Sequence, residues 1–220
     1  MRGLTIDHES SALVTTIATM TGLSDGASRV EVAQARLSSI RGLRGAAIHV
    51  SPARNVLFEY FQWQDEGSMR KGEDALRLPY VKLGANEMWF ANSKRVLLTP
   101  GPNQPSVDFS LQADPSAPRP TLVSYITCEP ERQTELTAYL ANSAERFTTL
   151  FGGWIGAALH PREDERGITE YLQFETIERM AALQDRTELI AHKNHLATFG
   201  AFQAQLVLPV AVLNPGRGIE

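Results

Sequence analysis

Glu59 and Trp63 are the two residues whose types and spacing suggest chemistry most directly. They lie four residues apart in a segment with the alternation of a β-strand, so both should point to one side of it, together with Leu57 and Phe61. Glu59 is therefore the lone carboxylate on a side that is otherwise apolar. Burial among such neighbours raises the pKa of a carboxyl group. A carboxylate with a pKa nearer to neutrality could act as a general base, although Glu59 could instead pair with a cation such as Arg95.

Trp63 could wall a ligand pocket and donate its indole N–H to a ligand oxygen, or it could pack in a core. We expect Phe61 and Met69 to line the same pocket as substrate-binding residues. His49 precedes a predicted hairpin loop, where it could shuttle protons or bind a substrate carbonyl, or could simply bond to the backbone. Glu59, Trp63 and His49 are thus the predicted catalytic residues.

Several classes of protein are disfavoured by composition and motifs. The net charge is -4, the pI is near 5.8 and the basic residues are scattered, which argues against nucleic acid as a partner. The single cysteine, Cys128, cannot form an internal disulfide, and neither a signal peptide nor an apolar run of about 18 residues is present, so we expect a cytoplasmic protein. His192 and His195 share a predicted helix face, but no nearby carboxylate completes a metal site. We therefore expect no metal and no phosphate-binding loop.

The chain repeats itself at a constant offset of 111 residues. The matching positions are Gly45–His49 with Gly156–His160, Glu59–Trp63 with Glu170–Phe174, Met69 with Met180, Lys82 with Lys193, and Val96–Leu97 with Val207–Leu208. A unit of this length is a domain rather than a solenoid repeat. Trp63 is replaced by Phe174 in the second copy, which suggests that only one copy kept a site. We expect the larger pocket in the first copy.

Each copy is predicted to run strand, helix, strand, strand, helix, strand. In the first copy we expect strands at 12–20, 46–50, 56–63 and 94–99, a helix around 28–40, and two helical segments within 65–92, broken by Gly72 and Pro79. In the second copy we expect strands at 122–128, 154–174 as a hairpin, and 203–210, with helices around 136–150 and over 177–199. The predicted fold is α+β: two ferredoxin-like βαββαβ repeats whose antiparallel sheets pack into a pseudo-dimeric α+β barrel. The predicted domains are 10–100 and 120–214, joined by a proline-rich linker, 101–119.

The hairpin residues resemble a known family. The run Gly45-Ala46-Ala47-Ile48-His49, followed by Glu59-Tyr60-Phe61-Gln62-Trp63, is similar to the antibiotic biosynthesis monooxygenase family, with its Gly-x-x-x-His strand and Asn-Tyr-x-Gln-Trp strand. Both copies fit, so the chain is identified as a tandem member. By this resemblance Trp63 matches the pocket tryptophan, His49 the strand histidine, and Lys82, a substrate-binding candidate, lies near a helix arginine. Glu59 and Glu170 stand where the family often has asparagine, and the first strand lacks the family's asparagine.

The resemblance implies a monooxygenase that oxidises an electron-rich polycyclic aromatic or quinol of polyketide type with O2. The reaction would pass through a substrate anion, with O2 as co-substrate and without metal or another cofactor, although reduced flavin is possible. The alternatives are a non-catalytic barrel that binds small aromatics, a flavin-dependent ring-cleaving oxygenase, and a heme-degrading relative. The expected partner is a small aromatic substrate, with no nucleic acid and no membrane. One chain is expected to complete a barrel by itself, and a homodimer of two such barrels is the alternative.

Overall fold

The structure, a computed structural model, describes residues 3–6, 14–21, 26–37, 39–53, 55–82, 87–101, 110–150 and 152–213. The first repeat comprises β2 (Val14–Thr21), α1 (Gly26–Leu37), β3 (Leu43–Val50), β4 (Leu57–Trp63), α2 (Glu66–Lys82), β5 (Glu87–Ser93) and β6 (Leu97–Pro100). The second comprises β8 (Thr121–Thr127), α3 (Gln133–Leu150), β9 (Trp154–Pro161), β10 (Gly167–Phe174), α4 (Ile177–Ala181), α5 (Thr187–Leu196) and β11 (Phe202–Leu213). Two short strands, β1 (Leu4–Ile6) and β7 (Leu111–Ala113), lie outside this pattern.

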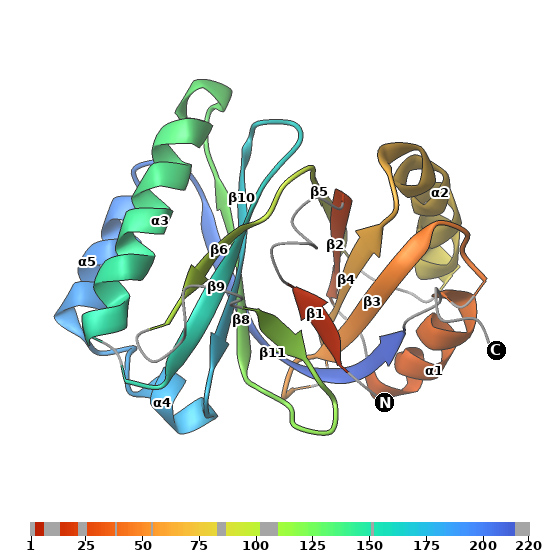
Figure 1. Ribbon diagram of the computed structural model, residues 1–220, viewed down its shortest axis with the longest axis horizontal. Coiled ribbons are helices and arrows are strands. Elements are labelled where there is room, and N and C mark those ends of the chain that lie inside the picture. Colours follow the sequence, from red (N-terminus) through yellow and green to blue (C-terminus); the bar gives the residue numbers. More distant parts are fainter. Residues whose placement is uncertain are drawn as a thin grey trace.

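The strands of both repeats form one antiparallel sheet in the order β5-β2-β4-β3-β11-β8-β10-β9-β6. The long strand β11 joins the repeats, because residues 202–207 pair with β8 and residues 208–213 pair with β3. Strand β6 of the first repeat likewise pairs with β9 of the second. The outer strands β5 and β6 are consecutive in the chain, so the sheet curls round with its helices outside (Figure 1). The predicted α+β barrel of two ferredoxin-like repeats is confirmed.

Side-chain alternation divides the apolar residues into layers. Phe58 and Tyr60 of β4 point into the barrel, where they belong to a cluster drawn from both repeats. Phe61 and Trp63 of the same strand point outward, and they pack with residues of α1 and α2. A third cluster lines the corresponding layer of the second repeat. Each repeat thus has an apolar layer between its sheet and its helices that is separate from the barrel interior.

Three predicted elements differ from the structure. The strand expected at 94–99 is replaced by two strands, β5 and β6, because the chain pairs first with β2 of its own repeat and then crosses to β9. Helix α2 runs unbroken through Gly72 and Pro79, whereas the helix expected over 177–199 is divided into α4 and α5. Pro79 lies near the end of α2, where little helix remains to be disrupted.

The predicted linker also contains structure. Strand β7 falls within 101–119 and pairs with β1, and their apolar side chains are buried in the barrel cluster. The proline-rich composition of the segment gave no sign of this pairing, because three residues are too few for a periodic pattern. The domain boundaries at 10–100 and 120–214 remain a prediction. No helix within the described ranges is long and apolar enough to cross a membrane.

Candidate functional site

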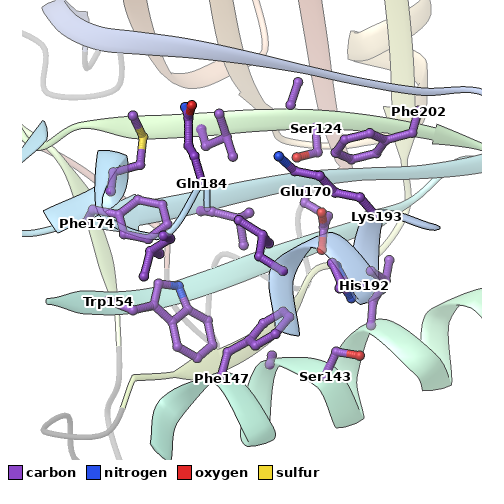
Figure 2. A pocket seen from close by; sticks show the side chains of 18 of the residues that line it. Ser124, Ser143, Phe147, Trp154, Glu170, Phe174, Gln184, His192, Lys193 and Phe202 are labelled. Atoms are coloured by element: carbon purple, nitrogen blue, oxygen red, sulfur yellow. The ribbon is translucent and has the colours of Figure 1, made fainter. Parts of the chain in front are cut away.

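A cavity of about 460 Å³ lies in the second repeat, between the sheet and the helices. Its floor comes from β8, β9, β10 and β11, and its other walls come from α3, α4, α5 and the segment between α4 and α5 (Figure 2). This volume falls within the range of small-molecule sites, about 300–1,000 Å³. We expected the larger pocket in the first repeat. The cavity of this size that the described residues line lies instead in the second repeat.

Aromatic side chains form one end of this cavity. Trp154 of β9 and Phe174 of β10 are cross-strand partners, and Phe147 of α3 lies beside Trp154 in the view of Figure 2. The indole Nε1 of Trp154 donates a hydrogen bond to the Gly156 carbonyl at 3.1 Å, which fixes the ring against the strand. Flat, rigid walls of this kind suit an aromatic ligand.

Glu170 is the carboxylate of the cavity. It lies in the middle of β10, opposite Ser124 of β8, and it is 6% exposed. Burial raises the pKa of Glu170 to about 7, and a hydrogen bond from Ser124 opposes this shift. A carboxyl group with a pKa near 7 can take up a proton and release it again near neutral pH.

His192 and Lys193 of α5 bring two further polar groups to the cavity (Figure 2). The Nδ1 atom of His192 lies 3.0 Å from the hydroxyl of Tyr139, and the two rings stack at 5.4 Å. Burial, together with the positive charges of His195, Arg146 and Lys193, lowers the pKa of His192 to about 4. The imidazole is therefore neutral at pH 7, while Lys193 supplies a positive charge at the edge of the cavity.

The first repeat places its predicted site residues in a packed layer. Phe61, Trp63, Met69 and Glu59 are all fully buried. The indole Nε1 of Trp63 donates to the Thr16 hydroxyl at 3.0 Å, so the donor that we expected to reach a ligand is already used within the protein. Their roles as catalytic and substrate-binding residues remain predictions that this packing disfavours. Lys82 is the last residue of α2, and its side chain lies outside the described part of the structure.

His49 lies on the other face of the sheet, inside the barrel. Its Nε2 is 2.8 Å from the Tyr171 hydroxyl, and the equivalent pair, His160 and Tyr60, is separated by 2.9 Å. Burial lowers the pKa of His49 to about 3 and that of His160 to about 4. The catalytic role of His49 remains a prediction, which this geometry disfavours because the imidazole is enclosed inside the barrel and its Nε2 contacts Tyr171 rather than the cavity.

No group of three or more His, Cys, Asp or Glu side chains that could hold a metal ion is found among the described residues. His192 and His195 instead both contact the ring of Tyr139, with centroids at 5.4 and 4.2 Å. These contacts tie α5 to α3 beside the cavity.

The sequence did contain signals for the residues that we missed. Glu170 is the repeat partner of Glu59 and Lys193 that of Lys82. Trp154 occupies the position that corresponds to Leu43, the cross-strand neighbour of Trp63. The second repeat has therefore kept a tryptophan in this strand pair. It lies on β9, at Trp154, whereas the first repeat has its tryptophan on β4, at Trp63. Trp154 can be found in the sequence when the strand next to each matched position is compared, in addition to the matched position itself.

Solved structures share this architecture. An anthrone oxidase-like protein superposes with a TM-score of 0.82 at 12% sequence identity, with 98% of each chain covered. A protein described as a putative monooxygenase from Fusobacterium nucleatum gives a TM-score of 0.60 at 9% identity, covering 93% of this chain and 95% of its own. A chlorite dismutase variant from Candidatus Nitrospira defluvii gives 0.50 at 14%, covering 90% and 91%. No family model and no curated protein matches the sequence. At such identities these likenesses confirm the family resemblance at the level of the fold.

Proposed function

Since the chain has the fold of monooxygenase-like and anthrone oxidase-like proteins, we propose that it is a monooxygenase whose active site is the cavity of the second repeat. The proposed substrate is an electron-rich fused-ring phenol or quinol, of which anthrones are examples. The observation that carries the proposal is Glu170, a buried carboxyl group with a pKa near 7 in a cavity with aromatic walls. The base predicted at Glu59 is thus assigned to its repeat partner.

The proposed reaction begins with proton transfer to Glu170. Loss of a proton from an activated methylene group leaves a carbanion that is delocalised into the ring. This carbanion bonds to one atom of O2, and the negative charge moves to the distal oxygen. Protonated Glu170 returns its proton there to give a hydroperoxide. Loss of water removes the second hydrogen from the carbon and breaks the O–O bond, so a methylene group and O2 become a carbonyl group and water.

The remaining polar groups of the cavity support the anion. The ammonium group of Lys193 offsets the charge that appears on the substrate oxygen. His192 is neutral and is oriented by Tyr139, so it can hydrogen-bond a substrate oxygen without competing for the proton of Glu170. Trp154 and Phe174 hold the ring system at the other end of the cavity.

Oxygen uptake with a hydroxylated anthrone, which carries the activated methylene group that the reaction needs, tests the proposal. We expect uptake by the wild-type protein without an added cofactor, and a loss of about 10²–10⁴-fold in Glu170→Gln. Glu59→Gln is the matched control, since it makes the same change at the equivalent place of the first repeat, and it should retain activity if the protein folds. Full activity in Glu170→Gln would overturn the assignment. Uptake that requires reduced flavin would change the reaction written above, and binding without uptake would indicate a non-catalytic binding barrel.

A further inference from the structure

The two repeats differ in what fills the layer between sheet and helices. In the second repeat, Phe174 and Leu183 line the cavity. The positions that correspond to them in the first repeat are Trp63 and Gly72. Trp63 has no exposed surface, and it belongs to a continuous apolar cluster with Phe61 and the helical residues. The first repeat thus has the larger side chain on the strand, Trp63, and no side chain at the helix position that faces it, Gly72.

The contact between Trp63 and Gly72 is close enough to require glycine. A Cβ atom at position 72 would lie 2.2 Å from Cη2 and 2.4 Å from Cζ3 of the indole ring. Separations under about 3 Å do not occur between real Cβ atoms and ring carbons. The indole therefore extends to the backbone of α2, into space that a leucine borders in the second repeat.

The helices that cover this layer also differ between the two repeats. α2 is one continuous helix of 17 residues over the indole, whereas the corresponding part of the second repeat breaks between α4 and α5. Leu183 lies in this break and lines the cavity. The unbroken helix of the first repeat thus packs on a tryptophan, and the broken helix of the second repeat covers a cavity.

We propose that the first repeat contains a second aromatic-binding site, which the indole ring of Trp63 occupies as a built-in ligand. Removal of the indole ring would therefore leave room for one ligand in the first repeat. The class of ligand follows from the occupant: a flat bicyclic aromatic with an N–H or O–H group that can donate to the Thr16 hydroxyl, as the indole does at 3.0 Å. This inference is independent of the oxidation proposed for the second repeat.

Trp63→Ala with free indole as the probe tests it. Calorimetric titration should show one more indole bound per chain than in the wild-type protein, whether the wild type binds one or none. Saturating indole should raise the melting temperature of the variant by about 3 °C or more relative to its effect on the wild type. Indene, which has the shape of indole without the N–H, should bind the new site roughly two- to tenfold more weakly. A folded variant that binds the same number of indoles as the wild type would overturn the proposal.

If Trp63→Ala does not fold, the residue pair of the second repeat provides the test. Gly72→Leu alone should lower the melting temperature sharply, because its side chain meets the indole. Trp63→Phe combined with Gly72→Leu copies the pair found at 174 and 183, and it should recover at least half of that loss. No recovery would mean that the indole does not fill the space that corresponds to the cavity, and the proposal would fail.

Discussion

The imidazole Nε2 of His49 lies 2.8 Å from the hydroxyl of Tyr171, so a histidine of one repeat is bonded to a tyrosine of the other. The reciprocal pair, Tyr60 and His160, repeats this contact at 2.9 Å. Nδ1 of His160 is 3.3 Å from the Thr169 carbonyl and is placed to donate to it, which leaves Nε2 to accept from the tyrosine. Burial also raises the pKa of both tyrosines, so their hydroxyl groups remain protonated donors. The repeated histidine therefore connects the two halves of the barrel.

Tyr171→Phe should destabilise the protein by about 1–3 kcal/mol, because it leaves the buried Nε2 of His49 without its hydrogen-bond partner. Urea unfolding measures this change. His49→Phe combined with Tyr171→Phe removes both polar partners, and it should be less destabilised than the sum of the two single variants. Additive effects would show that the pair is not coupled in the folded protein.

The buried histidines should make stability depend on pH in acid. In the folded protein the pKa is about 3 for His49 and about 4 for His160, whereas it is 6.5 in the unfolded chain. Between the folded and the unfolded pKa of each histidine, the unfolded chain therefore binds more protons than the folded protein. The stabilisation is present above pH 6.5, and it is lost as the pH falls toward 4. We expect the free energy of unfolding to fall by up to about 1.4 kcal/mol per pH unit for each histidine. Glu170 has the opposite sign, because its raised pKa stabilises below pH 4.5 and this contribution is lost as the pH rises through about 7.

His49→Gln separates these contributions. Glutamine can hydrogen-bond to Tyr171 but does not titrate. The unfolding free energy of the variant should therefore depend less steeply on pH between 6.5 and 4 than that of the wild-type protein. Urea titrations at several pH values compare the variant with the wild type. Equal slopes would show that His49 does not remain neutral in the folded state.

Turnover should rise with pH through about 7, since Glu170 acts as a base only when it is deprotonated. The hydrogen bond from Ser124 opposes the effect of burial, so Ser124→Ala should move the rising limb to higher pH. Ser143→Ala is a suitable comparison, because this residue lines the same cavity from α3 and no hydrogen bond from it contributes to the pKa of Glu170. The measurement is kcat/KM against pH with a substrate that does not titrate in this range.

Gly72→Ala should destabilise the protein by about 1–3 kcal/mol, because the new Cβ would overlap the Trp63 ring. Gly67 lies in the same helix, but a Cβ there has its nearest neighbour at 3.4 Å, and Gly67→Ala should be neutral or stabilising by up to about 1 kcal/mol. Thermal unfolding of the two variants compares an alanine under the indole with one at an exposed position. Equal melting temperatures would contradict the packing described for the first repeat.

The sequence predicted the architecture better than the position of the cavity. The offset between Gly45 and Gly156 indicated two copies, and alternation correctly placed Phe61 and Trp63 on one face of β4. Whether a tryptophan lines a space or fills it depends on the residue that faces it. Trp63 meets Gly72 only after α2 has folded back over the sheet, and no local pattern reports that contact. β5 was taken for helix because its strand partner, β2, is about 70 residues earlier in the chain.

Strand β11 has a consequence for the order in which the protein can fold during synthesis. Residues 208–213 pair with β3, a strand that leaves the ribosome more than 150 residues earlier. Until β11 emerges, the hydrogen-bonding edge of β3 has no partner from the barrel, even though β4 can already pair with its other side. The first repeat is therefore made first but completed last, and a nascent chain carries an exposed strand edge for most of its translation. Such edges attract other chains, so the nascent chain is most exposed to edge-to-edge aggregation during this interval.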